Sequence, residues 1–116
     1  MKEVKAIVKN FKVNDIINNL VKSGYPNITI SISEGTGTFE GYNAGISTQF
    51  SISDSQVAKI ELVCADFDAD LVANIISRYG RTGHSGDGLI YISELSKAIK
   101  VKTGDEIHLD VKSIKW

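Results

Sequence analysis

The sequence has few residues that cross-link a chain or interrupt its helices and strands, and its positive and negative charges nearly balance. It has one cysteine, one proline and one tryptophan in 116 residues. A single cysteine excludes an internal disulfide, and the N-terminus lacks the apolar core of a signal peptide, so we expect a cytoplasmic protein. Thirteen basic residues nearly cancel 14 acidic ones, which gives no global field for nucleic acid. No apolar run approaches the roughly 20 residues of a membrane span, so direct membrane insertion is not expected.

Apolar periodicity predicts two successive units of strand, helix and strand within one domain, residues 1–116. The strands are expected over residues 3–9, 28–33, 57–64 and 88–93, and the helices over residues 13–21 and 71–79. A helical turn and a last short strand are expected within residues 94–104. This order predicts an α+β fold, a ferredoxin-like βαβ-βαβ sandwich with both helices on one face of an antiparallel sheet.

Two segments break this pattern. Residues 35–56, between the second and third strands, lose all periodicity and are rich in glycine, serine and threonine, so we expect a long flexible loop there. Residues 105–116 form a C-terminal extension with Ile107, Leu109 and Val111 on one side of an alternating pattern. We expect the extension to add a strand or to pack at a subunit interface.

The stretch GRTGHSGDG, residues 80–88, places four glycines in nine positions. One interpretation is a tight turn. The other is a phosphate site, because glycine without a Cβ lets backbone N–H groups come close to an anion. The residues of this stretch alone leave both interpretations open.

Four segments together resemble the PII signal-transduction proteins in order and spacing: VKAIVKNFKVNDIINNLVKSG, VAKIELVC, RTGHSGDGLIYIS and AIKVKTGDE. The resemblance covers roughly residues 1–106. It implies a homotrimer that binds an adenine nucleotide (ADP, ATP or AMP) in each cleft between subunits. It further implies signal transduction in nitrogen regulation, with the long loop reporting the bound ligand to a membrane transporter or metabolic enzyme.

The same resemblance implies a set of nucleotide-binding residues. The phosphate loop corresponds to Thr82, Gly83, His84, Gly86, Asp87, Gly88 and Leu89, the adenine wall to Thr29, Glu61, Leu62, Val63 and Cys64, and the first bend of the long loop to Gly35, Thr36, Gly37 and Thr38. Lys100 and Lys102 of a neighbouring subunit correspond to a pair of arginines in the family. On an extended segment they would point the same way and neutralise phosphate, without the bidentate fork of arginine.

Several positions depart from the family pattern. Thr38 and Phe39 stand where the family has an arginine and a magnesium-holding glutamine, and a benzyl ring cannot coordinate magnesium. Val57, or Gln56 with a slip of one residue, replaces the lysine that pairs with 2-oxoglutarate, and Leu89 replaces a lysine that reaches the distal phosphates. We therefore expect neither magnesium nor the ordinary 2-oxoglutarate response. Modification by the family's route is not expected either, because Phe50 stands near the place of the modified tyrosine.

Three other functions have some support in the sequence or in the fold it predicts. An acylphosphatase-like hydrolase needs an arginine-bearing phosphate loop, but the only arginines are Arg78 and Arg81, so we expect no catalytic residues and no enzyme. A metal-responsive structural trimer, like the divalent-cation tolerance proteins, stays open, although His84 and His108 lack metal-ligand spacing and no metal residue is assigned. A regulator of inorganic-carbon or metal transport that senses another small anion, such as bicarbonate, also stays open.

Two smaller features have plain structural explanations. Cys64 ends an apolar strand and is expected to be a buried small hydrophobe. Asp66, Asp68 and Asp70 lack the glycine and the terminal glutamate of a calcium loop, so we expect them to form an acidic helix N-terminus.

Overall fold

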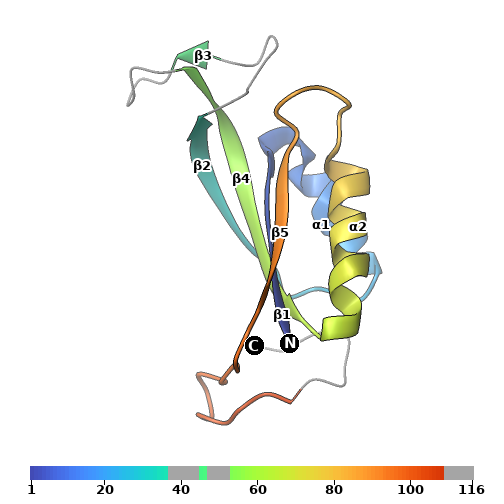
Figure 1. Cartoon of the computed structure of the whole chain (residues 1–116), viewed down its shortest axis with the longest axis vertical. Coiled ribbons are helices and arrows are strands. Elements are labelled where there is room, and N and C mark those ends of the chain that lie inside the picture. Colours follow the sequence, from blue (N-terminus) through green and yellow to red (C-terminus); the bar gives the residue numbers. More distant parts are fainter. Residues whose placement is uncertain (37–44, 47–52, 109–116) are drawn as a thin grey trace.

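An antiparallel sheet with two helices on one face organises the chain (Figure 1). The computed structural model describes residues 1–36, 45–46 and 53–108. Its elements are, in chain order, β1 (Lys2–Lys9), η1 (Asn10–Lys12), α1 (Val13–Lys22), β2 (Thr29–Thr36), β3 (Gly45–Ile46), β4 (Ser53–Cys64), η2 (Asp66–Asp68), α2 (Ala69–Gly80) and β5 (Gly88–Glu94). The strand order is β2-β4-β1-β5, with β3 paired to β4. This arrangement confirms the ferredoxin-like fold.

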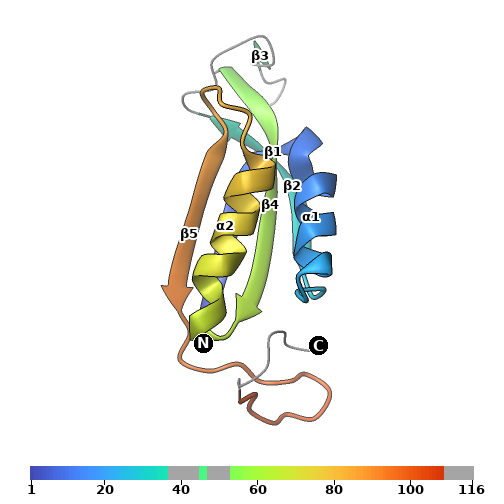
Figure 2. The same ribbon diagram turned by 90° about the vertical axis from the view of Figure 1, so that its right-hand side faces the viewer.

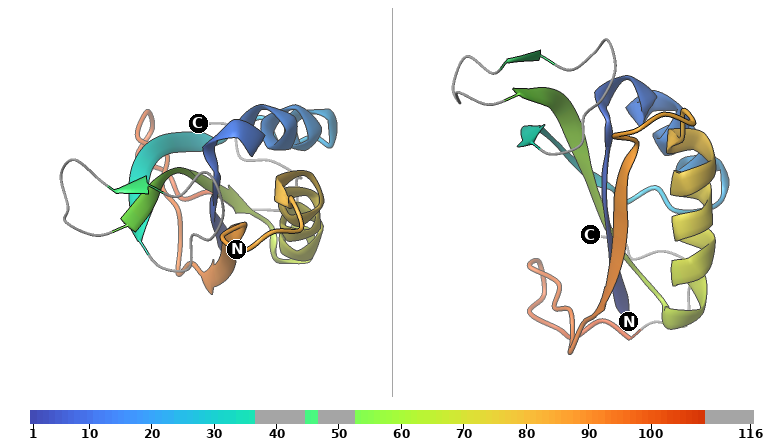
Figure 3. Two further views of the ribbon diagram at one scale, coloured as in Figure 1. Left: turned by 90° about the horizontal axis from the view of Figure 1, so that it is seen from above. Right: turned by 45° about the horizontal axis from the view of Figure 1, so that its top comes forward.

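Both helices cover the same face of the sheet, and no helix of the described residues covers the other face (Figures 2 and 3). Each helix has an apolar stripe at helical spacing, which must be buried against another element. Ile16 and Leu20 of α1 and Val72 and Ile76 of α2 are buried in this layer. The expected helices are confirmed, with bounds within two residues of the pattern.

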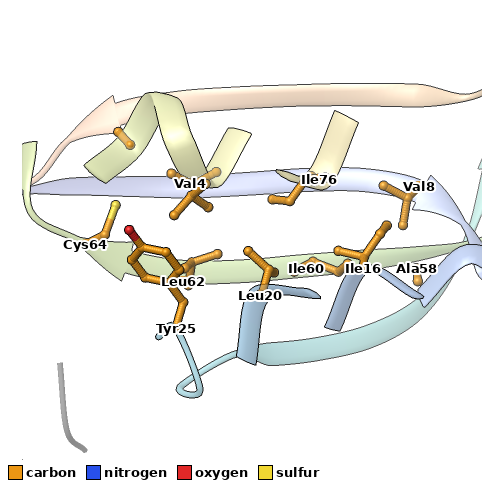
Figure 4. Packing of buried hydrophobic residues seen from close by; sticks show 13 residues of the cluster. Val4, Val8, Ile16, Leu20, Tyr25, Ala58, Ile60, Leu62, Cys64 and Ile76 are labelled. Carbon is orange, nitrogen blue, oxygen red and sulfur yellow. The ribbon is translucent and has the colours of Figure 1, made fainter. Parts of the chain in front are cut away.

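The turn that ends α1 determines the position of Tyr25 in the core. Gly24 has φ of 97°, the left-handed conformation that favours glycine. The Tyr25 N–H donates to Leu20 O at 2.9 Å and the Gly24 N–H to Val21 O at 3.0 Å, which is the paired hydrogen bonding of a Schellman motif. This turn directs the Tyr25 side chain into the core, where it is 1% exposed (Figure 4).

The core lies between the sheet and the helices. Its buried residues are Val4, Ala6, Val8, Ile16, Leu20, Tyr25, Ala58, Ile60, Leu62, Cys64, Ala69, Val72 and Ile76. The alternate residues of β1 and β4 enter this cluster because successive side chains of a strand point to opposite faces. Cys64 is fully buried, which confirms its expected role as a small core hydrophobe.

The strands beside the long loop are longer than the apolar pattern indicated. β4 begins at Ser53 rather than at residue 57, and β2 continues to Thr36, opposite Asp54. β3 adds a short pairing with the same end of β4. The ladder needs only backbone hydrogen bonds, so it runs past the core without apolar alternation. The remaining loop residues, 37–44 and 47–52, lie outside the described residues.

β2 is also less buried than its alternating isoleucines suggest. Ile28 packs against the core, but Ile30 is 41% and Ile32 is 54% exposed. They pair with Ile60 and Ala58 of β4 and so share the helix-facing side. β2 is the outer strand on this side of the sheet, where the helices give less cover.

The segment after β5 forms a hairpin-like turn, not the expected helical turn and strand. The Lys100 N–H donates to Asp105 O at 2.9 Å, and the Gly104 N–H donates to Lys100 O at 2.8 Å. A single bridge joins Ile99 and Glu106. Local backbone bonds across this turn replace the helical ones. The predicted extension lies largely outside the described residues, which end at His108. Within those residues, no helix has the length and apolarity needed to cross a bilayer.

Candidate functional site

The glycine-rich loop joins the end of α2 to the start of β5. Gly83 and Gly86 have φ of 85° and 80°, so both occupy the left-handed region that costs other residues energy. Gly88 has φ of 117°, and a Cβ built on it would lie 1.8 Å from the Ile7 carbonyl oxygen. Gly88 is therefore required by the close approach of β5 to β1, independently of any ligand.

Asp87 holds this loop together. Its carboxylate accepts the backbone N–H of Thr82 at 2.8 Å and that of Gly83 at 2.9 Å, and it also accepts the Thr82 hydroxyl. The Lys9 ammonium lies 3.3 Å from the same carboxylate and 3.3 Å from the Thr82 hydroxyl oxygen. Partial burial raises the pKa of Asp87, but these bonds outweigh it and lower the pKa to about 2. The loop is thus closed by one ionised acid.

This bonding changes which part of the loop is available to an anion. The Thr82 and Gly83 amides, both predicted to meet phosphate, are already bonded to Asp87. The His84 N–H donates to the Thr82 hydroxyl at 3.2 Å, and its side chain is exposed. The first half of the loop is therefore a tight turn, and an incoming phosphate would have to meet the second half, around Gly86.

A hollow of about 380 Å³ adjoins that second half of the loop. Its lining residues are Ile7, Val8, Val57, Gly86, Asp87, Gly88 and Leu89. Leu89 lies opposite Ile7 in the β1–β5 ladder, and both are on the sheet face that α1 and α2 leave uncovered. Sequence reasoning missed Ile7 and Val8 as part of this site. The signal for Ile7 was its apolar side chain between Lys5 and Lys9 on an otherwise charged face.

The residues predicted to form the adenine wall extend from the middle of the sheet, where Thr29 and Glu61 pair beside Lys5, to its other end. Gly88 and Ala58 both stand opposite Val8, whereas Cys64 stands opposite Lys2. Five residues separate Ala58 from Val63, which is roughly 17 Å along a strand. The β2–β4 ladder ends at the pair Thr29 and Glu61, so β2 does not pair with the last three residues of β4. Gly35 and Thr36 end β2, and Gly37 and Thr38 lie outside the described residues.

The lysine pair also lies far from the loop within one chain. β5 runs from Gly88, opposite Val8, to Glu94, opposite Lys2, so the segment that follows leaves at the opposite end of the sheet (Figure 1). Lys100 and Lys102 are both exposed. Residues 101–103 form a turn, so the two lysines do not share one face of an extended segment, contrary to expectation. The hydrogen bonds between residues 100 and 105 impose that turn.

No group of three or more metal-ligating side chains occurs in the described part of the chain. The aspartates near α2 instead have structural partners. Asp66 bonds the N-terminal ammonium, and Asp68 accepts the Tyr25 hydroxyl at 2.9 Å. Asp70 lies in the first turn of α2. This agrees with the expected acidic helix start.

The fold and the loop define an α+β sandwich of ferredoxin-like type with a glycine-rich turn ahead of β5. A family model for nitrogen regulatory protein P-II matches residues 1–105. A nitrogen regulatory protein P-II from Nostoc punctiforme is 33% identical over 107 residues, covering 91% of this chain and 96% of the relative. A nitrogen regulatory protein GlnK from Escherichia coli K12 is 32% identical over 106 residues, covering 90% and 95%.

The chain therefore belongs to the P-II family of nitrogen regulatory proteins. The resemblance noted in the sequence is confirmed. The family model and both relatives describe nitrogen regulatory proteins, so the chain belongs to a family of regulators. The matched region ends at residue 105, so most of the C-terminal extension lies beyond the shared family sequence.

Proposed function

We propose that the protein is a cytoplasmic regulatory homotrimer that binds an adenine nucleotide between subunits and signals through residues 35–56. The observation that carries this proposal is the separation of the glycine loop from Lys100 and Lys102, at opposite ends of the sheet. One chain cannot bring these groups to one phosphate. A site that uses both needs a second copy, which is the arrangement that the family resemblance implies.

The chemistry of the two parts is complementary. The loop is preorganised by Asp87, so its second half pays little ordering entropy when an anion binds. Lys100 and Lys102 are exposed ammonium groups, which form charge-assisted hydrogen bonds to phosphate. Together they supply backbone donors from one copy and positive charge from the next.

Signalling follows from the connections of the long loop. The loop joins β2 to β4, the two strands that carry Thr29 and residues 61–64. Thr29 and residues 61–64 lie at the ends of these strands away from the loop, so a ligand there acts on the loop along the length of both strands. If the ligand binds two loop states unequally, its arrival shifts their populations and alters docking of a partner protein, such as a transporter or enzyme.

The ordinary 2-oxoglutarate response is not part of this function. Val57 is 3% exposed and lines the apolar hollow, and it offers no charge to a dicarboxylate. Thr38 and Phe39 replace the family's arginine and glutamine. The nucleotide is thus the signal in this proposal, without magnesium-bound 2-oxoglutarate.

The first test is isothermal titration of the full chain with AMP, ADP and ATP, with and without magnesium and 2-oxoglutarate. We expect one nucleotide per chain and no effect of 2-oxoglutarate. The double variant Lys100→Ala with Lys102→Ala should bind about 100-fold more weakly or worse, because two charged hydrogen bonds are lost. The matched control is Lys97→Ala, which removes an exposed lysine outside the pair.

A second arm tests whether the site spans two copies. Asp87→Asn chains, with a weakened loop, are co-expressed with chains that lack both lysines. In mixed assemblies some interfaces pair an intact loop with intact lysines, so binding should return in part. Absence of any adenylate binding by the unaltered protein, or a monomer by sedimentation, would refute the proposal.

A further inference from the structure

The hollow beside the glycine loop is lined by apolar side chains on the side where the loop leads into β5. Leu89 comes directly after Gly88, is 64% exposed, and lines the hollow together with Ile7 and Val57. Asp87 is the only charged residue in the described lining, and it is an acid. Any phosphate chain that extends from the loop toward Leu89 therefore meets hydrocarbon and a negative charge.

Two cations near the loop are already engaged, and a third, Lys59, stands opposite Ile7 in the β1–β4 ladder but does not line the hollow. Lys9 is paired with Asp87 at 3.3 Å, so the pair adds no net charge. The Arg81 side chain turns back to the end of α2, where its Nε donates to Ser77 O at 3.0 Å and its Nη2 to Ser77 Oγ at 3.0 Å. Neither group faces a ligand as an uncommitted positive charge.

The long loop brings no positive charge either. The sequence contains no lysine or arginine between Lys22 and Lys59, a stretch that includes all of residues 35–56. It does contain Glu34, Glu40 and Asp54. The residues between Lys22 and Lys59 therefore supply no cationic side chain that could neutralise phosphate.

We propose that the site selects a purine nucleoside monophosphate over the corresponding triphosphate, and that Leu89 is the residue that determines this preference. The inference rests on the proposed function, which supplies Lys100 and Lys102 from the neighbouring copy. Two lysines match the charge of one phosphomonoester, about −2 near neutral pH. Each further phosphoryl group adds negative charge that finds no partner in the hollow and must lose its hydration there.

The test compares the affinities of AMP and ATP for the full chain and for two variants of Leu89, in the absence of magnesium. The unaltered protein should bind AMP about tenfold or more tightly than ATP. Leu89→Lys places an ammonium beside the loop and should raise ATP affinity about tenfold relative to AMP. Leu89→Met, an uncharged side chain of similar volume, should leave the ratio unchanged.

The outcomes separate this inference from the function on which it rests. Tighter binding of ATP than of AMP by the unaltered protein overturns the selectivity and leaves the nucleotide site intact. If Leu89→Lys changes the affinities for AMP and ATP equally, Leu89 does not determine the preference. Failure of every adenylate to bind overturns the proposed function, and the selectivity with it. Because the key variant gains affinity, misfolding cannot mimic the expected result.

Discussion

Two aspartates at opposite ends of α2 are held in contrasting ways. Asp68, just before the helix, is 4% exposed and accepts one described bond, from the Tyr25 hydroxyl at 2.9 Å. Its second oxygen, Oδ2, is buried without a hydrogen-bond partner among the described residues. Asp87, in the loop after the helix, has a 26% exposed side chain and is bonded by Thr82, Gly83 and Lys9.

The two environments give the two acids different roles. A buried acid with one partner cannot exchange that partner for water, so its bond matters to the stability of the fold. A partly exposed acid with several partners can replace some of those bonds with bonds to water, so its bonds matter more to the shape of the loop. We therefore expect changes at the Asp68 end to lower stability, and changes of the Asp87 carboxylate to affect the loop first.

Gly88 also lies at the loop end, but we expect its substitution to lower the stability of the fold, and by more than any other proposed substitution. Gly88→Ala places a Cβ 1.8 Å from the Ile7 carbonyl oxygen at φ of 117°. We expect the free energy of unfolding to fall by about 4 kcal/mol or more, because the β1–β5 ladder must separate. Urea denaturation followed by far-UV circular dichroism, at one fixed chain concentration, measures this loss.

Gly83→Ala is the matched control for Gly88. Gly83 has φ of 85°, but a Cβ there would meet nothing within 4 Å. The cost should be only the left-handed backbone, about 1 to 2 kcal/mol. Equal losses for the two variants would contradict the assignment of Gly88 to strand packing.

Much of this fold was predictable from the sequence because its signals are local. The stripe that includes Ile16 and Leu20 and the alternation that ends at Cys64 each report burial against one layer. The extra strand length at Ser53 and Thr36 was not predictable in this way. Pairing there depends on the backbone of two distant segments, which leaves no periodic trace in the side chains.

The candidate site was predictable in position and less so in detail. Four glycines in nine residues marked the loop, but the role of each depends on contacts across the fold. The Ile7 carbonyl requires a glycine at position 88, and the Lys9 ammonium pairs with Asp87. Ile7 and Lys9 both lie more than 70 residues earlier in the chain. The pairing of Tyr25 with Asp68 is likewise a tertiary contact. The turn at Lys102 arises from bonds between residues 100 and 105 that the basic pattern does not indicate.

The second largest effect is expected at the Asp68 end. Tyr25→Phe removes the hydroxyl and leaves the buried carboxylate with no described partner. We expect a loss of about 3 kcal/mol in the free energy of unfolding, because the desolvation penalty of Asp68 is no longer offset. Urea denaturation under the same conditions as for the glycine variants checks this.

A double variant sharpens that result. Tyr25→Phe combined with Asp68→Leu replaces both polar partners with apolar groups, which is often close to neutral. The double variant should therefore be more stable than Tyr25→Phe alone. If it is less stable, the Asp68 carboxylate has a stabilising partner beyond Tyr25, and the contrast between the two acids fails.

The third effect concerns pH at the loop end. The pKa of Asp87 is lowered to about 2 from the usual 3.8, so its stabilising contribution is present above about pH 4 and is lost as pH falls through 2. Asp87→Asn should cost up to about 2 kcal/mol at pH 6. Unfolding measured between pH 6 and pH 2 should show the two proteins converging in stability.

Glu94→Gln provides the control for this pH series, since it removes the same charge from an exposed side chain paired with Lys2. The control should follow the unaltered protein across the series. A constant gap between Asp87→Asn and the unaltered protein down to pH 2 would mean that the carboxylate charge does not hold the loop.

The last effect is kinetic and returns to the Asp68 end. Burial, followed by the charge of Asp68, raises the pKa of the Cys64 thiol from 9.0 to about 11, so at pH 8 the folded chain should hold roughly 100-fold less thiolate than the unfolded one. A disulfide reagent should label the native protein at least that much more slowly than the protein in urea. Tyr25→Phe should label faster, because a less stable fold opens more often. Native labelling as fast as in urea would show that this end of the sheet is open to solvent, and would make the loop end the better protected of the two.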